Sequence, residues 1–415
     1  MGRLLRSGGG LVAAGLLVAA CGPGVSGSTT TSSTVPAGPS PGVTASTITI
    51  GNVSTTGGLA GALFLGAQVG VQAYVDYANS KGGIDGRKLS LLNDDDELSC
   101  PTNKSDTEAL VPKVIAFVGQ FSLSDACGAA VIPKTVPDVS TALDPPVTKL
   151  PNVFSPQPIQ NGWSTGTLLW LKQKYPSDVG KVGALVGNVT TVQSSWKTED
   201  NALVKTGFKV LTVQSYDVGQ TNLSQEVLAM KNDGVQIVLL DQADVNGIAN
   251  FVDDMVTQHW HPAIVFNSGS AYDGSFIKLA GAAASVMTVG LHESLYLGQD
   301  ASSVPAVGTF DHWIGVAKPG FTPDLYAVYG WSSAVLLAQA LQSAGSDPTR
   351  ASLMAALKKI TNFDAGGLLA PDDPAAKTPP NCFLIAKVVN GNWQRVEPSS
   401  GFTCSGTYIS DPSVP

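Results

Sequence analysis

The sequence predicts an α/β protein with two doubly wound domains, and two observations carry this prediction. First, strand-like and helix-like segments alternate in two successive sets, which a proline-rich stretch around Pro145, Pro146 and Pro151 separates. Second, several predicted strands are unbroken apolar runs, such as 115–118 and 237–240, which are typical of parallel sheets covered on both faces. In such sheets, ligands bind beyond the carboxyl ends of the strands.

The first set contains a long helix, because apolar residues recur from Val71 at positions i, i+3, i+4 and i+7. Its predicted elements are, in order, a strand at 48–50, a glycine-rich loop at 57–61, that helix, strands at 88–93 and 114–119, and a short helix that begins near Asp125.

The second set repeats the alternation with shorter helices. Its predicted elements are a helix at 162–174, a strand at 182–186, a helix at 196–205, a strand at 210–216, a helix at 223–230 with Asn222 as its cap, a strand at 237–240, a helix at 245–258 and a strand at 264–266.

The composition excludes several classes of protein. Hydrophobic residues make up 43% of the 415 residues and charged residues 13%, against about 25% charged in an average soluble protein, so the chain is not intrinsically disordered. Asp and Glu number 32 against 24 Lys and Arg, for a net charge of −8. We therefore expect no nucleic-acid partner, because no broad basic surface is available for a phosphate backbone.

The N-terminus has the parts of an export signal. Arg3 and Arg6 precede an apolar run at 11–20, which is too short to span a bilayer and ends in small residues before Cys21. The Val-Ala-Ala-Cys ending resembles the bacterial lipobox, in which the cysteine is lipidated. We therefore predict a signal peptide at 1–20, and a lipidated Cys21 with a flexible tether at 21–46 that is rich in Gly, Pro, Ser and Thr.

Residues 79–96 carry a distinctive pattern: Asn-Ser-Lys-Gly-Gly-Ile-Asp-Gly-Arg-Lys, a strand, and three aspartates. With segments at 48–51, 56–60, 117–122 and 389–393, this pattern resembles the type I periplasmic binding proteins of the leucine/isoleucine/valine-binding family, which are solute receptors of ABC importers. The glycines of the turn allow positive φ, and its role is structural, so Arg87 is not expected to contact ligand.

The resemblance covers essentially all of residues 47–397 and implies two lobes joined by a three-segment hinge. Lobe one is placed at 47–158 and 291–360, and lobe two at 159–290 and 361–415. The implied protein is a monomer, lipid-anchored outside the cytoplasm to the bacterial cell membrane. It would capture a small polar organic molecule and deliver it to an ABC permease and ATPase complex. The alternative is an extracytoplasmic sensor subunit for a signalling partner.

The resemblance also implies where ligand binds. In relatives that bind amino acids, hydroxyls and backbone amides of two lobe-one loops hold the α-carboxylate, and an acid from lobe two meets the ammonium. Here Asp144 stands where the family usually has threonine, and Ser270 stands where it has the acid. Asp144 or Asp241 could take over the amine, or the ligand could be a neutral or polyhydroxyl molecule, an amide or a small aromatic.

The candidate ligand-binding residues lie on loops that lead into helices, and for each of them a purely structural role is the competing interpretation; Ser124, for example, could be a helix N-cap. They are Leu59, Phe64, Ser122, Ser124, Ser140, Ala142, Asp144, Asn188, Trp196, Asp241, Asp244, Ser270 and Tyr272.

The five cysteines divide into one plus four if Cys21 is lipidated. The other four can pair in three ways. A bridge joins the regions of Cys100 and Cys127 in some relatives, which implies the pairs Cys100–Cys127 and Cys382–Cys404.

Enzyme signals are weak, and the sequence predicts neither catalysis nor a cofactor. It contains no Gly-x-Ser-x-Gly elbow, phosphate loop or dinucleotide fingerprint. His259 and His261 are two residues apart, but no Cys or carboxylate cluster with ligand spacing lies near them. We interpret them as surface histidines at a helix end and predict no metal site.

Overall fold

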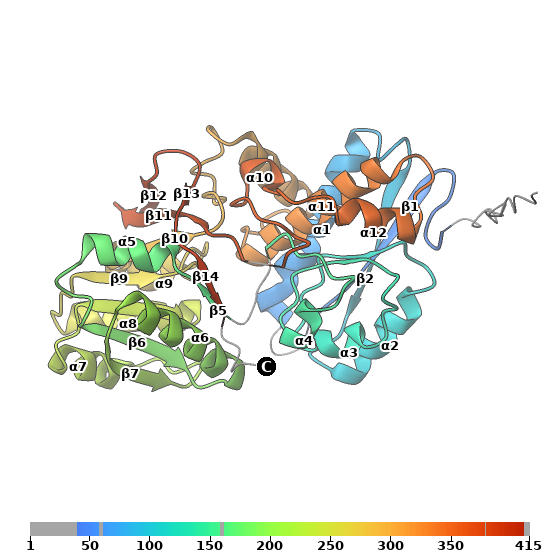
Figure 1. The fold of residues 1–415 in the computed structure, drawn as a ribbon. Coiled ribbons are helices and arrows are strands. Elements are labelled where there is room, and N and C mark those ends of the chain that lie inside the picture. The colour runs from blue at the N-terminus through green and yellow to red at the C-terminus, as the bar shows by residue number, and fades with distance from the viewer. Residues whose placement is uncertain (1–39, 58–60, 158–161, 378, 411–415) are drawn as a thin grey trace, which may run out of the picture. The chain divides into compact units, whose positions relative to one another are not determined.

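The structure is a computed structural model that describes residues 40–57, 61–157, 162–377 and 379–410 (Figure 1). Two main β-sheets with mostly parallel strands organise this part of the chain, and a two-stranded sheet completes it. The predicted signal peptide, Cys21 and Leu59 lie outside the described residues.

The first sheet has the strand order β2-β1-β3-β4, and all its neighbouring strands are parallel. Its strands are β1 (Thr47–Ser54), β2 (Lys88–Asp95), β3 (Phe117–Val118) and β4 (Asp138–Val139), and the helices that alternate with them are α1 (Gly61–Ser80), α2 (Cys100–Leu110), α3 (Asp125–Ala129) and α4 (Pro145–Thr148).

The second sheet has the order β12-β11-β10-β9-β8-β6-β7, in which β6 to β10 run parallel and β11 and β12 antiparallel. Its strands are β6 (Val182–Gly187), β7 (Val210–Tyr216), β8 (Ile237–Gln242), β9 (Ile264–Asn267), β10 (Met287–Leu291), β11 (Cys382–Val389) and β12 (Asn392–Glu397), and β13 (Thr403–Cys404) pairs with β11. The helices of this part are α5 (Gly166–Lys174), α6 (Thr190–Thr206), α7 (Ser224–Asn232), α8 (Val245–Thr257), α9 (Phe276–Ala280) and the 3₁₀ turn η1 (Gly281–Val286).

The apolar strands lie where the sequence predicts them, because a strand covered on both faces can bury every side chain. All six residues of β6 are buried, as are all four of β9. The fold prediction of doubly wound α/β units is confirmed. The proposed lobe boundaries and hinge stay predictions.

After β10 the chain returns to the first sheet and then to the second. The helices α10 (Pro305–Ala317), α11 (Leu325–Ala344) and α12 (Arg350–Leu357) follow β10, and α10 and α11 both pack against α1 (Figure 1). A second 3₁₀ turn, η2 (Ala365–Gly367), precedes β11. The matched segment at 389–393 forms the turn of the β11–β12 hairpin, and its residues Asn390 and Gly391 both have positive φ, as a type I′ turn requires.

The glycine-rich turn between α1 and β2 has the predicted structural role. Gly82, Gly83 and Gly86 all have positive φ, and the Gly83 amide donates to Ala78 O at 2.9 Å. Arg87 donates from Nε to Thr44 O at 2.8 Å and from Nη1 to Ser346 O at 2.5 Å, so it ties together three surface segments.

Both implied disulfides are present in the structure. Cys100 at the start of α2 is bonded to Cys127 in α3, and Cys382 at the start of β11 is bonded to Cys404 in β13. The first bridge therefore fixes the loop between β3 and α3, and the second closes the C-terminal segment onto the second sheet.

Several element boundaries differ from the prediction for tertiary reasons. The predicted helix at 162–174 begins only at Gly166, because residues 162–164 form β5 and pair with β14 (Tyr408–Ser410) near the C-terminus. The predicted strand at 114–119 reduces to the two residues of β3. In addition, α6 begins at Thr190 rather than Trp196.

The predicted Asn222 cap of α7 is also wrong by one residue. Leu223 occupies the N-cap position, and Asn222 Oδ1 accepts from the Ser224 amide at 3.1 Å. A carboxylate from another helix binds the start of α7 instead: Asp254 of α8 accepts from the Leu223 amide at 2.6 Å.

The described fold begins before the predicted start at Thr47. The amide of Thr49 donates to Gly42 O at 2.7 Å, and Val43 forms a β-bridge with Ile48. Within the described ranges, no helix combines the length and the apolar character that crossing a bilayer requires.

Candidate functional site

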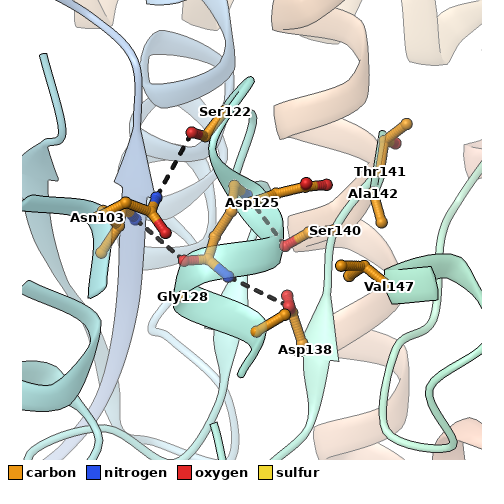
Figure 2. Close-up of a pocket in the computed structure, with 12 residues that line it drawn as sticks. Asn103, Ser122, Asp125, Gly128, Asp138, Ser140, Thr141, Ala142 and Val147 are labelled. Carbon is orange, nitrogen blue, oxygen red and sulfur yellow. Dashed lines mark hydrogen bonds between the residues drawn. The ribbon is translucent and has the colours of Figure 1, made fainter. Parts of the chain in front are cut away.

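A small cavity lies among the loops at the carboxyl ends of β3 and β4, beside α2 and α3 (Figure 2). Its volume is about 20 Å³, which is room for about one water molecule. It therefore lies under the predicted ligand loops, between polar and apolar side chains, and is too small to hold an organic solute.

Ser122, the first predicted ligand hydroxyl, lies buried in a polar network beside this cavity. Its Oγ donates to Asp96 Oδ2, and it accepts from the Ser124 amide at 2.9 Å. Asn103 Nδ2 donates to the same Asp96 oxygen at 2.9 Å, and Thr55 Oγ1 donates to the other at 2.6 Å. The structure thus places the Ser122 hydroxyl against protein groups just beyond the carboxyl ends of the first sheet's strands.

Ser124 occupies the N-cap position of α3 but makes no side-chain capping hydrogen bond. Its hydroxyl lies half-buried beside the ligand loop. Ser124 is therefore an N-cap residue by position, but its hydroxyl does not accept the hydrogen bond that a capping side chain usually accepts.

The second lobe-one loop runs between β4 and α4. Two of its backbone amides donate to a carboxylate of the protein. Asp125 Oδ2 accepts from the Leu143 amide at 2.7 Å and from the Asp144 amide at 3.2 Å. In Figure 2 the Asp125 side chain points from α3 toward the loop that carries Thr141 and Ala142. Burial raises the pKa of Asp125 to about 6, although the two amides oppose this shift.

The other candidate residues of this loop have three different environments. Ser140 Oγ accepts from the Gln120 amide at 3.0 Å, and Ala142 packs against Val147 in a small apolar cluster. Asp144 occupies the N-cap position of α4 without a capping hydrogen bond, and its buried Oδ1 has no hydrogen-bond partner among the described residues.

Phe64 belongs to a compact aromatic cluster on the first sheet's side. Its ring lies 5.1 Å from Phe121 and 5.0 Å from Tyr326, and Phe121 lies 4.7 Å from Tyr326. Leu143 packs against this cluster. The aromatic cluster thus borders the loop between β4 and α4, as an apolar wall of a ligand site would.

In the second sheet, the predicted acids have different environments. Asp244 caps α8, because Oδ1 accepts from the amides of Asn246 at 3.0 Å and Gly247 at 3.2 Å, while Oδ2 accepts from Tyr216 OH at 2.6 Å. Asp241 accepts through Oδ1 from the Ser268 amide. Asp241 and Asp244 are both half-buried, so exposure does not distinguish the two acids.

The remaining second-sheet candidates include exposed and buried residues. Asn188 is exposed and donates to Asp217 Oδ1 at 3.0 Å, and the exposed Ser270 donates to Ala243 O at 3.1 Å. Trp196 is 8% exposed and packs in the second sheet's core.

Tyr272 is 1% exposed, so this candidate ligand-binding residue is a core residue in the structure. Its ring lies 4.8 Å from Tyr296 and 5.3 Å from Trp393, and its hydroxyl donates to Gln299 Oε1 at 2.7 Å. The sequence did not reveal this, because burial of an aromatic loop residue depends on strands far away in the chain.

The sequence interpretation missed several buried or half-buried acids, among them Glu293, Asp324 and Glu199. Burial raises the pKa of Glu293, which follows β10, to about 7, and the pKa of Asp324, which caps α11, to about 7. Glu199 in α6 is fully buried, and burial, followed by the charge of Asp241, raises its pKa well above the usual range. The sequence held no signal for them, because a single acid in a helix or after a strand is usually solvated.

Comparisons with known proteins agree with this architecture. A family model described as periplasmic binding protein matches residues 47–392. The Leu/Ile/Val-binding protein homolog 7 of Brucella abortus (strain 2308) is 23% identical over 218 residues, or 49% of this chain, and the match spans about half (54%) of that protein's length.

Two solved structures share the fold. A putative branched-chain amino acid ABC transporter protein from Rhodospirillum rubrum superimposes with a TM-score of 0.68 at 19% identity, covering 84% of this chain and 100% of the other. A fatty acid ABC transporter substrate-binding protein from Thermomonospora curvata gives a TM-score of 0.71 at 20% identity, covering 88% and 95%. At these identities the likeness shows the fold alone.

Proposed function

The chain belongs to the periplasmic binding protein family, and we propose on that premise that it is an extracytoplasmic solute receptor. It captures a small polar organic molecule between its two α/β lobes and delivers it to an ABC permease and ATPase complex. The observation that carries this proposal is the family match over residues 47–392, which spans both sheets. A ligand that contacts both lobes would favour a closed form.

The loops at the carboxyl ends of both sheets support the proposal. Helix-leading loops follow β3 and β4 in the first sheet and β8 and β9 in the second, which is where doubly wound sheets bind ligands. The first sheet's loops carry polar groups, and their residues Phe121 and Leu143 pack with Phe64 of α1 and Tyr326 of α11 in one apolar cluster. Such a mixture of an apolar wall and a few polar groups suits a small organic solute.

We propose that Cys21 carries the lipid anchor, that the segment between Cys21 and the β-bridge at Val43 acts as a tether, and that the receptor works as a monomer. No catalytic role is proposed. The alternative function is a sensor subunit that reports the same solute to a signalling partner. A gene neighbourhood with permeases and ATPases would favour import, whereas an adjacent histidine kinase would favour sensing.

The mature protein is expected to show a rise in melting temperature with one class of small solute. A ligand present at 100 times its Kd stabilises the folded state by about 2.7 kcal/mol, which corresponds to a shift of several degrees. The measurement is a thermal-shift screen over amino acids, amines, amides, polyols and aromatic acids, with isothermal titration calorimetry on each positive compound.

An unrelated protein screened in parallel is the control for compounds that perturb the dye. If no solute of any class shifts the melting temperature and none binds by calorimetry, the solute-receptor proposal is wrong.

A further inference from the structure

The cavity beneath the loops that follow β3 and β4 has the size of one water molecule. Its volume is about 20 Å³, whereas a single water molecule needs roughly 10–15 Å³. Its wall combines apolar side chains, such as those of Val53 and Val147, with polar ones, which include Asn103 of α2 and Asp138 of β4 (Figure 2). Enclosed spaces with apolar walls stay dry, whereas polar groups that lack partners bind water. The hydrogen bonds of the polar groups therefore decide what the cavity holds.

Asn103 presents an unsatisfied acceptor at this wall. It is 3% exposed, and its Nδ2 donates to Asp96 Oδ2 at 2.9 Å. This hydrogen bond fixes the orientation of the side-chain amide, because only the nitrogen can donate to a carboxylate. The other atom of the amide, Asn103 Oδ1, is buried and has no hydrogen-bond partner among the described residues. It faces Gly128, which also lines the cavity, since a Cβ atom there would lie 2.5 Å from Asn103 Oδ1.

Asp138 presents a second unsatisfied acceptor. It is the first residue of β4 and is 5% exposed. Its Oδ2 accepts from Gln120 Nε2 at 3.2 Å, but its buried Oδ1 has no hydrogen-bond partner among the described residues. The ion pairs of the described ranges join other residues, so no base there neutralises this carboxylate. A buried acceptor without a donor is unfavourable, so a donor is required beside Oδ1.

One water molecule matches these two acceptors. Neither Asn103 Oδ1 nor an ionised Asp138 Oδ1 can donate, so the two oxygens cannot satisfy each other. A water molecule donates through both of its hydrogens, one to each oxygen. Its own oxygen can accept from a hydroxyl such as that of Ser140, which lines the same cavity. Buried waters typically make about three hydrogen bonds to groups of this kind.

A metal ion fits this wall less well than water does. Hard cations such as Ca²⁺ and Mg²⁺ take about six or more oxygen ligands. Within the described ranges, no three His, Cys, Asp or Glu side chains gather into a group that could hold a metal ion. Asp125, the other acid of the wall, already accepts from two backbone amides. The wall therefore favours a neutral ligand that donates hydrogen bonds.

We propose that this cavity is a binding site for one buried water molecule, which donates to Asn103 Oδ1 and to Asp138 Oδ1. The water joins α2 to β4 at the base of both loops. Asp138 begins the strand that leads into the loop between β4 and α4, and Asn103 shares Asp96 with Ser122 of the loop after β3. This inference goes beyond the receptor function and does not depend on the solute, so the water is expected with and without solute.

The first test is a high-resolution crystal structure of the unliganded mature protein. One water peak is expected within about 2.5–3.2 Å of both Asn103 Oδ1 and Asp138 Oδ1. A cavity without density, or density in contact with only one of the two oxygens, would overturn the proposal. A peak with about six oxygen neighbours at about 2.1–2.6 Å would identify a cation and would overturn it as well.

The second test counts long-lived internal waters in solution by oxygen-17 magnetic relaxation dispersion, with two variants at one position. In Asp138→Leu, methyl groups replace both carboxylate oxygens, so the cavity narrows and the water loses a partner. This variant is expected to hold one long-lived water fewer than the wild type. Asp138→Asn is the matched control, because it keeps the shape of the side chain and its polar atoms, and it is expected to retain the water.

An equal number of long-lived waters in Asp138→Leu and in the wild type would overturn the assignment of the site. Circular dichroism checks that both variants fold. If Asp138→Leu does not fold, the wild-type crystal structure decides alone, because it shows directly whether a water lies between the two oxygens.

Discussion

Gly70→Ala is expected to lower the free energy of unfolding by about 3 kcal/mol. A Cβ atom at Gly70 would lie 2.1 Å from Ala327 O and 2.8 Å from Trp331 N, which are backbone atoms of α11. The backbone of α1 is equally close to α11, since a Cβ atom at Gly330 in α11 would lie 2.1 Å from Ala67 O in α1. Backbone atoms cannot rotate aside as a side chain can, so the two helices must separate and loosen the core between them.

Chemical denaturation monitored by circular dichroism measures this effect through the midpoint and slope. Gly315→Ala in α10 is the matched control, because no atom lies within 4 Å of its added Cβ and alanine is favoured over glycine in a helix by about 1 kcal/mol. The control is expected to be as stable as the wild type or more so. A Gly70→Ala variant within about 0.5 kcal/mol of the wild type would show that α1 and α11 do not pack this closely.

The unliganded protein is expected to be most stable at mildly acidic pH and to lose stability as the pH rises toward 8. Burial raises the pKa of Asp125 to about 6 and those of Glu293 and Asp324 to about 7. Each group is neutral in the folded protein at a pH at which the unfolded chain has already lost the proton. The stabilisation is therefore complete below the unfolded pKa near 4 and is lost as the pH rises through the folded values.

Glu293 alone shifts from 4.5 to about 7, which corresponds to roughly 3 kcal/mol. Melting temperatures measured from pH 5 to pH 8 at low protein concentration check the expected decline. Glu293→Gln should flatten the profile, whereas Asp347→Asn, which replaces an exposed carboxylate, should leave it unchanged. A melting temperature that rises steadily over this range would contradict the assignment of these acids as buried and neutral.

The parts of the fold that depend on local patterns could be predicted from the sequence. The buried strand at 237–240 is recognisable because unbroken apolar residues suit a strand covered on both faces. The glycines at 82, 83 and 86 predicted a turn because positive φ is easily reached without a Cβ. The disulfide pairs came from the family resemblance, which supplied the spatial order that spacing alone leaves open.

Predictions failed where a distant segment decides the local structure. Residues 162–164 look like the start of a helix, but pairing with β14 more than 240 positions later makes them a strand. Tyr272 likewise lies in the core because its ring packs against Tyr296 and Trp393, which are distant in the sequence. The hydrogen-bonding and packing partners are not visible in the residues next to such positions.

By itself, the sequence determined that this chain has two α/β sheets, export features and a resemblance to the periplasmic binding proteins, because hydrophobic periodicity, glycine turns and an ordered set of motifs are local properties of consecutive residues. Only the tertiary structure decided which acids are neutral and which amides are occupied. The hydrogen bond from Gln242 in β8 to Glu199 in α6 and the hydrogen bond from the Leu143 amide to Asp125 in α3 each join separate elements. Charge state and hydrogen-bonding capacity depend on such neighbours and on burial, both of which arise only when the chain folds.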